Sequence, residues 1–382
     1  MKPGRKQLLA AALSTVVAGT LAWLWLAREP EPIRLVDKTP EAEALLREHA
    51  AGAPAVDGGS ALVREPIGEE DAAKIWPRDE QLHVYDPHVY YRYRGGLDVA
   101  EGRHRVRTSA EGYREDFDRL PEKRDLFVVV TGDSHTDGVC ENRESFANRL
   151  EALLAERHPG KAIEVLNTGV SGYSFYHYLG SLERHLELKP DVFVAAFYGG
   201  NDFVDLIRPW HFFHHSVPPQ RSHEYWRKLS GAQKISSAYV GNAFNQLLYF
   251  QYNPDEMDVA LRASQEICAE IVRTCREHGI APLFVYIPPA VRGKAADRPE
   301  IGKILEALEL QESDCAQFDR LADSLIGRIE SLGAEVVDLR RSLGADAGSA
   351  YYLSDLHISP KAHEEIARIL LPKVEAAWRR ER

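Results

Sequence analysis

The order of apolar and amphipathic segments after residue 125 most constrains what this chain can fold into. Short apolar segments alternate with longer ones that carry apolar residues at helical spacing. The expected strands are residues 126–130, 162–167, 191–197, 281–289 and 334–339. The expected helices are residues 144–160, 176–188, 253–279, 317–333 and a last one after Ser359-Pro360. Because strands joined through helices run parallel, this order predicts a parallel sheet covered by helices on both faces.

The rest of the chain differs in composition from this α/β body. Residues 1–30 hold a long apolar run, and residues 31–80 are rich in Pro, Ala, Gly and Glu. Tyr- and Val-rich clusters broken by Gly follow in residues 81–124, which we expect to form a small β-rich extension. We therefore expect a membrane anchor, a stalk and this extension before the main domain, residues 125–382. An aromatic-rich insertion at about 203–252 interrupts that domain.

The N-terminal run has the features of a transmembrane helix. Lys2, Arg5 and Lys6 precede a charge-free stretch from Leu8 to Ala27. A helix of about 20 apolar residues spans the roughly 30 Å hydrocarbon core of a bilayer. Basic residues before the span favour a cytoplasmic N-terminus, which would place the main domain outside the cytoplasm. A cleaved signal peptide is the alternative; the length of the run and the lack of a small-x-small site favour an uncleaved anchor.

The net charge and the cysteine spacing bear on whether the protein binds nucleic acid, binds zinc or forms disulfides. The formal net charge is -11, and no basic stretch follows the N-terminus, so nucleic acid is not an expected partner. The spacing of the four cysteines fits no zinc-site pattern. Cys268 and Cys275 lie about 10 Å apart along one expected helix, too far to bridge. Cys315 could pair with either, and Cys140 could be free. We expect neither a metal nor a cofactor.

Small and polar residues follow the expected strands. In a parallel sheet the loops at the carboxyl ends of the strands build the site. The first strand leads into Gly-Asp-Ser with Ser134, the second into "NTGVSGYS" with Gly172, and the third into "YGGND" with Asn201. The segment before the last helix, "SDLHISPKAH", adds Asp355 and His357. We expect these four stretches to meet at one edge of the sheet.

The chemistry of these residues fits together. A serine hydroxyl is a poor nucleophile unless a neighbouring base takes its proton, and His357 can be that base for Ser134. Asp355 can orient the imidazole and stabilise the imidazolium. The developing oxyanion needs preorganised donors, which the backbone N–H groups of Ser134 and Gly172 and the Asn201 side-chain amide can supply. Gly169 of the same loop is the alternative to Gly172.

Four stretches carry a resemblance to a known family. "GDSHTDG", "NTGVSG", "GGND" and "DLHISPKAH" occur in this order between about residue 125 and the C-terminus. In this the chain resembles the SGNH hydrolase superfamily, the GDSL-type esterases. The resemblance implies a flavodoxin-like, three-layer α/β/α fold. It also implies Ser134 as nucleophile, Gly172 and Asn201 as oxyanion donors, and His357 as base.

The chain departs from the family pattern at two places. The usual leucine after the serine is His135, which we interpret as lining the substrate site. The usual aspartate three residues before the histidine is Ser354, while Asp355 stands two before it. The same Asp-x-His spacing occurs in relatives that act on acetyl groups of polysaccharides.

Several other side chains allow a functional or a structural interpretation. Aromatic residues of the insertion, with Trp210 and Phe213 as the substrate-binding candidates, form either a local subcore or a platform for a sugar or acyl chain. Helical spacing among His211, His214 and His215 could make a metal pair, but no acidic or cysteine pattern nearby completes it. His363 is expected on the surface of the last helix.

The predicted function is that of a membrane-anchored, extracytoplasmic serine esterase. It would remove an acyl or acetyl group from a glycan or lipid through a Ser-His-Asp acyl-enzyme mechanism. An O-acetyltransferase of the same fold, in which a sugar hydroxyl replaces water, is the first alternative. A non-catalytic glycan-binding or assembly protein is the second.

Overall fold

The computed structural model describes residues 39–51, 62, 64–116, 123–291, 298–344 and 347–380. The chain divides into two units, Met1–Asp37 and Lys38–Arg382, and all described residues belong to the second. The predicted anchor, residues 1–30, lies outside the described residues. In the part of the chain that the structure describes, every helix is too short or too polar to cross a bilayer.

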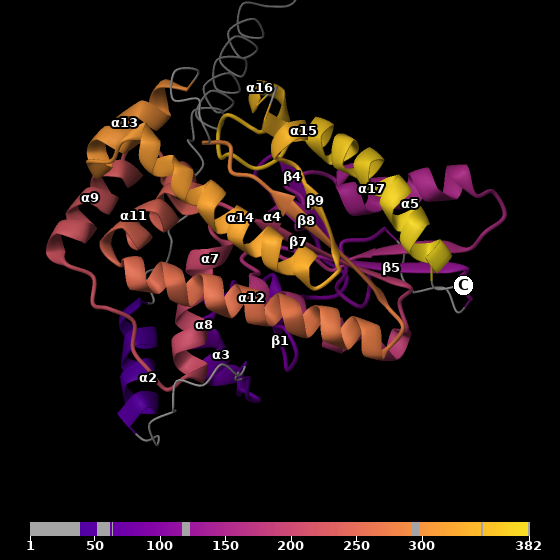
Figure 1. Cartoon of the computed structure of the whole chain (residues 1–382), viewed down its shortest axis with the longest axis horizontal. Coiled ribbons are helices and arrows are strands. Elements are labelled where there is room, and N and C mark those ends of the chain that lie inside the picture. Colours follow the sequence, from indigo (N-terminus) through magenta and orange to yellow (C-terminus); the bar gives the residue numbers. More distant parts are fainter. Residues whose placement is uncertain are drawn as a thin grey trace, which may run out of the picture. The chain divides into compact units, whose positions relative to one another are not determined.

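A five-stranded parallel sheet forms the centre of the second unit (Figure 1). Its strands are β5 (Leu126–Thr131), β6 (Ile163–Asn167), β7 (Val192–Tyr198), β8 (Ala281–Ile287) and β9 (Glu335–Asp338). They lie in the order β6-β5-β7-β8-β9 and pair in parallel throughout. This is the doubly wound strand order of flavodoxin-like folds. From β5 the chain first adds β6 on one side of the sheet and then adds β7, β8 and β9 on the other. The loops that follow β5 and β7 therefore diverge and leave room for a ligand.

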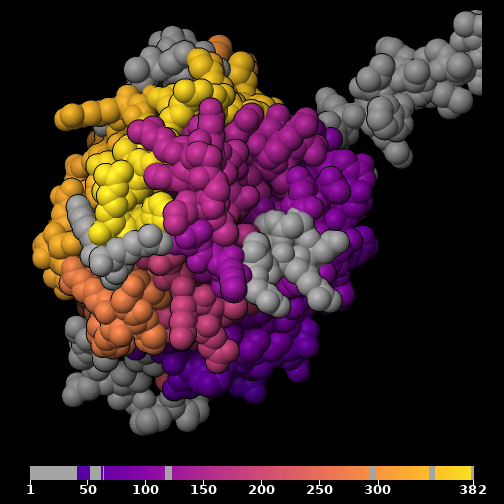
Figure 2. Space-filling model, turned by 90° about the vertical axis from the view of Figure 1, so that its right-hand side faces the viewer, coloured from indigo at the N-terminus to yellow at the C-terminus, as the bar shows by residue number. Residues whose placement is uncertain are grey.

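Helices cover both faces of this sheet and make three layers. They are α5 (Phe146–Arg157), α6 (Phe175–His185), α12 (Pro254–Glu277), α14 (Ala316–Ser331) and α17 (Pro360–Arg380). Right-handed crossovers place α6, α12 and α14 on one face, where Figure 1 shows α12 and α14 in front of the strands. The opposite face carries α5 and α17, which pack on each other; Figure 2 shows the C-terminal segment in yellow beside the magenta segment after β5. The predicted parallel α/β sheet is confirmed.

Two antiparallel hairpins precede the sheet. β1 (His83–Asp86) pairs with β2 (Tyr90–Tyr93), and β3 (Asp98–Glu101) pairs with β4 (His104–Arg107). We call the second pair the 98–107 hairpin. Its strand residues contribute little to the core, whereas the first hairpin buries several tyrosines. Both hairpins contact loops that carry the candidate site residues.

The predicted stalk, residues 31–80, is wrong for the part that the structure describes. Two helices lie there, α2 (Thr39–Ala51) and α3 (Glu69–Ile75). Leu46 and Trp76 are buried in the same hydrophobic cluster as the sheet, and the Trp76 ring stacks on Tyr90 at 4.0 Å between centroids. The Pro-, Gly- and Glu-rich composition conceals a few well-spaced apolar residues, which suffice to pack on an existing surface.

The aromatic insertion is a local subcore. Its helices are α7 (Asp202–Asp205), α8 (Ile207–Phe213), α9 (His223–Gln233), α10 (Ser237–Tyr239), the π-helical turn Val240–Phe244 and α11 (Asn245–Tyr252). Most of its aromatic side chains, such as Tyr225 and Phe250, are buried. The helix α13 (Pro299–Leu308) packs against α9. It was not among the expected helices, although its buried residues Ile301, Ile304, Leu305 and Leu308 repeat at helical spacing. The remaining helical segments are short: Ser134–Asp137 (α4), Asn142–Glu144, Leu186–Leu188, Glu312–Cys315, Arg340–Gly344 and Ala347–Ala350.

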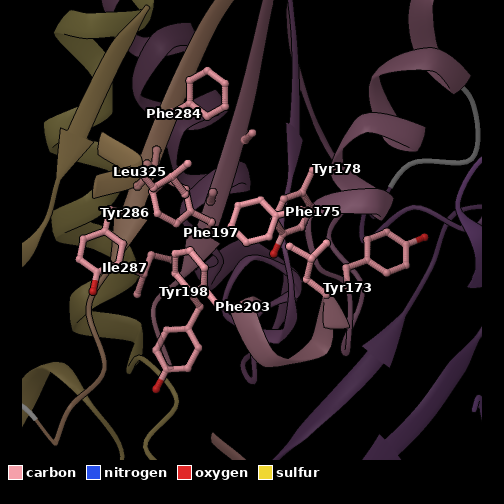
Figure 3. Packing of buried hydrophobic residues seen from close by; sticks show 14 of the residues in the cluster. Tyr173, Phe175, Tyr178, Phe197, Tyr198, Phe203, Phe284, Tyr286, Ile287 and Leu325 are labelled. Atoms are coloured by element: carbon pink, nitrogen blue, oxygen red, sulfur yellow. The ribbon is translucent and has the colours of Figure 1, made fainter. Parts of the chain in front are cut away.

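A cluster of buried rings supports the carboxyl ends of the strands (Figure 3). The Phe175 ring lies 5.3 Å from Phe203, and the Phe197 ring lies 5.3 Å from Tyr286. Burying one such side chain contributes roughly 1.5–3 kcal/mol, so the cluster gives the loops above it a rigid base.

All four cysteines are buried and unpaired, so Cys315 bridges neither of its two candidate partners.

Candidate active site

Ser134 is the first residue of α4, three residues after the end of β5. The preceding Asp133 caps this turn, because its Oδ1 accepts the His135 backbone N–H at 2.9 Å. A Cβ at Gly132 would lie 2.0 Å from Thr136 Oγ1, so only glycine lets the chain turn this tightly. The turn fixes the Ser134 hydroxyl at the edge of the sheet, where the side chain is nearly buried.

His357 meets this serine from the other end of the chain. Its Nε2 lies 2.9 Å from Ser134 Oγ, a hydrogen-bond distance, across 223 residues of sequence. The loop that carries it is closed by an antiparallel bridge between Tyr351 and Ile358. The Tyr352 N–H also donates to the His357 carbonyl at 2.8 Å. The predicted serine and histidine are therefore held together by a braced loop.

Asp355 approaches the other nitrogen of the same ring. Its Oδ1 lies 3.3 Å from His357 Nδ1 and accepts the His357 backbone N–H at 3.1 Å. The side-chain contact has ion-pair distance without the alignment of a good hydrogen bond, as is common before a substrate is bound. Burial opposes ionisation of Asp355, but the contacts with His357 and the charge of Arg103 outweigh it and lower its pKa. The carboxylate is thus charged at neutral pH.

Ser354, at the position of the usual family aspartate, does not contact the imidazole in the structure. Its Oγ donates to Asp355 Oδ2 at 3.3 Å and accepts from the Arg103 guanidinium at 2.6 Å. Asp355, two residues before the histidine, is therefore the acid that the fold brings to His357. Sequence reasoning missed Arg103, which lies 252 residues away from Asp355 and belongs to no motif.

The loop after β6 distinguishes the two glycine candidates. The Gly169 N–H donates to Asn167 Oδ1 at 3.1 Å, so it is already occupied. Gly172 has φ +82°, and a Cβ there would lie 2.9 Å from the Tyr91 hydroxyl. Among the described residues, neither the Gly172 N–H nor the Ser134 N–H donates to a protein group. Both are available to a developing oxyanion.

Asn201 occupies the N-cap position of α7, three residues after the end of β7, and its side chain makes no capping hydrogen bond. Its Oδ1 is buried and has no partner in the described part of the chain, and no protein acceptor there occupies its Nδ2. The neighbouring Asp202 differs, because its Oδ2 accepts the Tyr198 N–H at 2.8 Å and the Tyr178 hydroxyl at 2.6 Å. Asp202 therefore stabilises the loop, while the Asn201 amide stays free for a ligand.

Two buried acids lie around these loops. Burial raises the pKa of Asp133 to about 7. Burial, followed by repulsion from Asp133, raises the pKa of Asp202 well above its ordinary value. Carboxyl groups that stay partly or wholly protonated place less negative charge behind the serine, where an oxyanion would develop.

His135 does not line a substrate site. It is fully buried, its ring stacks on Tyr198 at 3.8 Å, and its Nδ1 accepts the Ile358 N–H at 3.4 Å. Burial lowers its pKa, so the neutral ring can accept this bond. The prediction was wrong because the turn after Ser134 directs the next side chain inward, toward Tyr198 and the loop of His357.

Of the other two substrate-binding candidates, Phe213 is structural, whereas Trp210 is partly exposed and stays a candidate. Phe213 is buried, and its ring packs near Trp76, Tyr90 and Tyr176. Trp210 is partly buried and stacks on a neighbouring histidine of its own segment. Neither ring has a described contact with Ser134 or His357. The hydrophobic side of α8 faces the N-terminal helices, which occupy it in place of a substrate.

His211 and His363 are both buried. His211 Nε2 lies 2.9 Å from Glu256 Oε2, and within the described ranges no cluster of three His, Cys, Asp or Glu side chains could hold a metal. His363, expected on the surface, is fully buried, and its Nδ1 accepts the Phe146 N–H at 3.1 Å. That expectation was wrong because α17 turns this face toward the start of α5.

Comparison with known proteins agrees with this geometry. The model of the GDSL-like lipase/acylhydrolase family matches residues 130–365. No curated protein sequence matches the chain.

Similar solved structures include LAE5, an α/β hydrolase enzyme from the metagenome of Lake Arreo, with 16% identity, 65% of this chain and 95% of that chain covered, and a TM-score of 0.38. A lipase/acylhydrolase from Enterococcus faecalis has 14% identity, coverages of 66% and 96%, and a TM-score of 0.38. A catalytic mutant of Axe2, an acetylxylan esterase from Geobacillus stearothermophilus, has 15% identity, coverages of 66% and 94%, and a TM-score of 0.39. These scores are too low to support an inference about substrate.

The family match covers well over half of the chain, which therefore belongs to the GDSL-like lipase/acylhydrolase family of the SGNH hydrolases, enzymes that cleave ester bonds.

Proposed function

We propose that this chain is a serine esterase that works through a Ser134-His357-Asp355 triad. The observation that carries the proposal is the 2.9 Å distance between His357 Nε2 and Ser134 Oγ, because it pairs a hydroxyl with the base that activates it. The Asp355 carboxylate beside Nδ1 supports the triad over a Ser-His dyad. The free Gly172 and Asn201 donors support acyl transfer through an oxyanion.

The roles of these residues in the reaction follow from their positions. Ser134 Oγ attacks the ester carbonyl carbon while His357 takes its proton, and Asp355 stabilises the imidazolium. The carbonyl oxygen becomes an oxyanion that accepts from the Ser134 and Gly172 N–H groups and from the Asn201 amide. His357 returns the proton to the departing alcohol, which leaves an acyl group on Ser134. Water, deprotonated by His357, attacks this acyl-enzyme, and collapse of the second intermediate frees the acid and Ser134.

We propose an acyl or acetyl ester on a glycan or lipid as the substrate. The Asp-x-His spacing supports an acetylated polysaccharide, by resemblance to relatives with that spacing. A sugar hydroxyl could replace water in the second half of the reaction, which would make the protein an O-acetyltransferase.

A fluorophosphonate probe tests the nucleophile directly. The probe should label the wild-type protein at Ser134 and should not label Ser134→Ala. Absence of labelling in a folded wild-type protein would instead favour a non-catalytic role. Acetate release from a panel of acetylated polysaccharides then identifies the substrate, and transfer to added sugar acceptors without release marks a transferase.

Gly172→Ala should lower kcat by about tenfold or more and leave substrate affinity less affected. An added Cβ meets the Tyr91 hydroxyl at 2.9 Å in a backbone conformation that alanine rarely adopts. The loop must shift, and the loss of one oxyanion donor typically costs about 10²–10³ in kcat. Steady-state kinetics with a small ester measure the effect. Gly160→Ala, also at positive φ but with open space around its Cβ, is the control; equal losses in both variants would contradict the donor role.

We further propose that residues 1–30 anchor the protein in a membrane with the catalytic unit outside the cytoplasm. The charge-free run from Leu8 to Ala27 after three basic residues supports this topology. The full chain should sediment with membranes and resist carbonate extraction, whereas a protein lacking residues 1–30 should be soluble and active. Recovery of the full-length gene product as a shortened soluble species would show cleavage by a signal peptidase instead.

A further inference from the structure

The 98–107 hairpin reaches the catalytic loop through one side chain. Glu101 pairs with His104, so Gly102 and Arg103 form the turn between β3 and β4. From this turn the Arg103 guanidinium donates to Asp355 Oδ2 and to Ser354 Oγ. The hairpin thus contacts the acid of the proposed triad, although it lies outside the segment that the family model matches.

The two oxygens of the Asp355 carboxylate have separate partners. Oδ1 faces the His357 ring and backbone N–H, and Oδ2 faces Arg103 and Ser354. A carboxylate can rotate about its Cβ–Cγ bond, so an anchor on Oδ2 determines where Oδ1 points. By binding Oδ2, Arg103 therefore keeps Oδ1 of Asp355 directed toward His357.

The guanidinium is itself held in position. It lies over the Tyr352 ring at 3.9 Å, a cation–π distance, and Tyr352 belongs to the same loop as His357. The backbone of Asp355 is held as well, because the Asn242 side chain donates a hydrogen bond to the Asp355 backbone carbonyl. Side-chain exposure is 32% for Arg103 and 18% for Asp355, so solvent screens this pair less than a fully exposed one.

We propose that Arg103 is a positioning residue for ester hydrolysis, which fixes the Asp355 carboxylate toward His357 and makes the 98–107 hairpin part of the active site. This inference rests on the proposed role of Asp355 as the triad acid. A surface ion pair with only a structural role would change the unfolding temperature and leave the kinetics alone.

The charge of Arg103 gives a second, independent readout. The charge of Arg103 helps to lower the pKa of Asp355, so its removal raises that pKa and the carboxylate loses its charge at a higher pH. The acidic limb of the kcat/KM profile should then move to higher pH. The other titratable groups that interact with Asp355 or His357 are not substituted in such a variant: Glu101, His104, Asp133, His135, Asp137, Tyr239 and His363. Of these, His104 also loses the charge of Arg103, which lowers its pKa.

The experiment compares three variants of the whole chain with the wild type, using a small ester. Arg103→Met should lower kcat by about tenfold, with KM nearly unchanged, and move the acidic limb to higher pH. A small misplacement of a catalytic group can cost up to about 10²-fold in rate. Arg103→Lys should keep the wild-type limb and recover part of kcat, since it retains the charge without the planar fork. The matched control is Arg105→Met, which removes an exposed pair with Asp98 on the same hairpin and should behave as wild type.

A double variant separates this inference from the triad itself. If Arg103 acts through Asp355, Arg103→Met added to Asp355→Asn should slow the reaction no further. Wild-type kcat and pH profile in Arg103→Met, with Asp355→Asn slow, would overturn the role of Arg103 and leave the triad standing. Wild-type rates in Asp355→Asn would overturn the triad acid and this inference with it. Should Arg103→Met unfold at the assay temperature, Arg103→Lys decides: unchanged kcat there would equally count against a positioning fork.

Discussion

Ser134→Ala is expected to lower hydrolysis of p-nitrophenyl acetate by roughly 10⁴-fold or more, as loss of a triad nucleophile does in other serine hydrolases. Alanine has no oxygen to form the acyl-enzyme. The hydroxyl makes one described side-chain hydrogen bond, to His357, so the fold should survive and the unfolding temperature should change little. Retention of most of the activity in the folded variant would remove Ser134 from the nucleophile role.

His357→Ala should be as damaging, and the double variant with Ser134→Ala little worse than either. Nucleophile and base act as one unit, so their losses do not add in free energy. Single-turnover rates of the three proteins measure this directly. If the two losses multiply, the serine and histidine do not work as a pair.

Asp355→Asn is expected to lower kcat at least about a hundredfold, within the range for triad acids, where the loss reaches about 10⁴. An amide keeps nearly the shape of the carboxylate but cannot stabilise the imidazolium by charge. Steady-state kinetics at several pH values measure the loss, and circular dichroism checks the fold.

Ser354→Ala is the matched control, because its hydroxyl contacts only the Oδ2 side of the acid and Arg103. It should cost far less than Asp355→Asn. Equal losses in the two variants, or a near-normal rate in Asp355→Asn, would mean that His357 works without its acid.

Much of the fold could be predicted because its signals are local. The strands and main helices after residue 125 are set by hydrophobic periodicity and by Gly and Pro boundaries, and crossover handedness then decides which face each helix covers. Ser134 and Asn201 could be located for the same reason, since each follows a strand whose end the sequence marks. His357 could be found because it stands in a motif next to a helix start.

The errors in the candidate site all concern burial or long-range contacts. Histidine is a polar residue type, so the sequence suggested accessible positions for His135 and His363. The fold directs both side chains inward, where burial lowers the pKa of each ring. Phe213 looked available because the N-terminal helices that contact α8 lie in a segment that resembled a stalk. Arg103 could not be found at all, because its role depends on a hairpin turn meeting a loop 252 residues later.

The sequence distance between Ser134 and His357 has a consequence for biosynthesis. The two residues are 223 positions apart, and the contact of His363 with Phe146 at the start of α5 spans 217 positions. A growing chain therefore carries its serine without a base until nearly all of it has been synthesised. Closing a contact across such a long loop costs more entropy than closing a local one. Because the proposed base reaches Ser134 only through this contact, esterase activity recovered on refolding would report that both ends of the catalytic domain have joined.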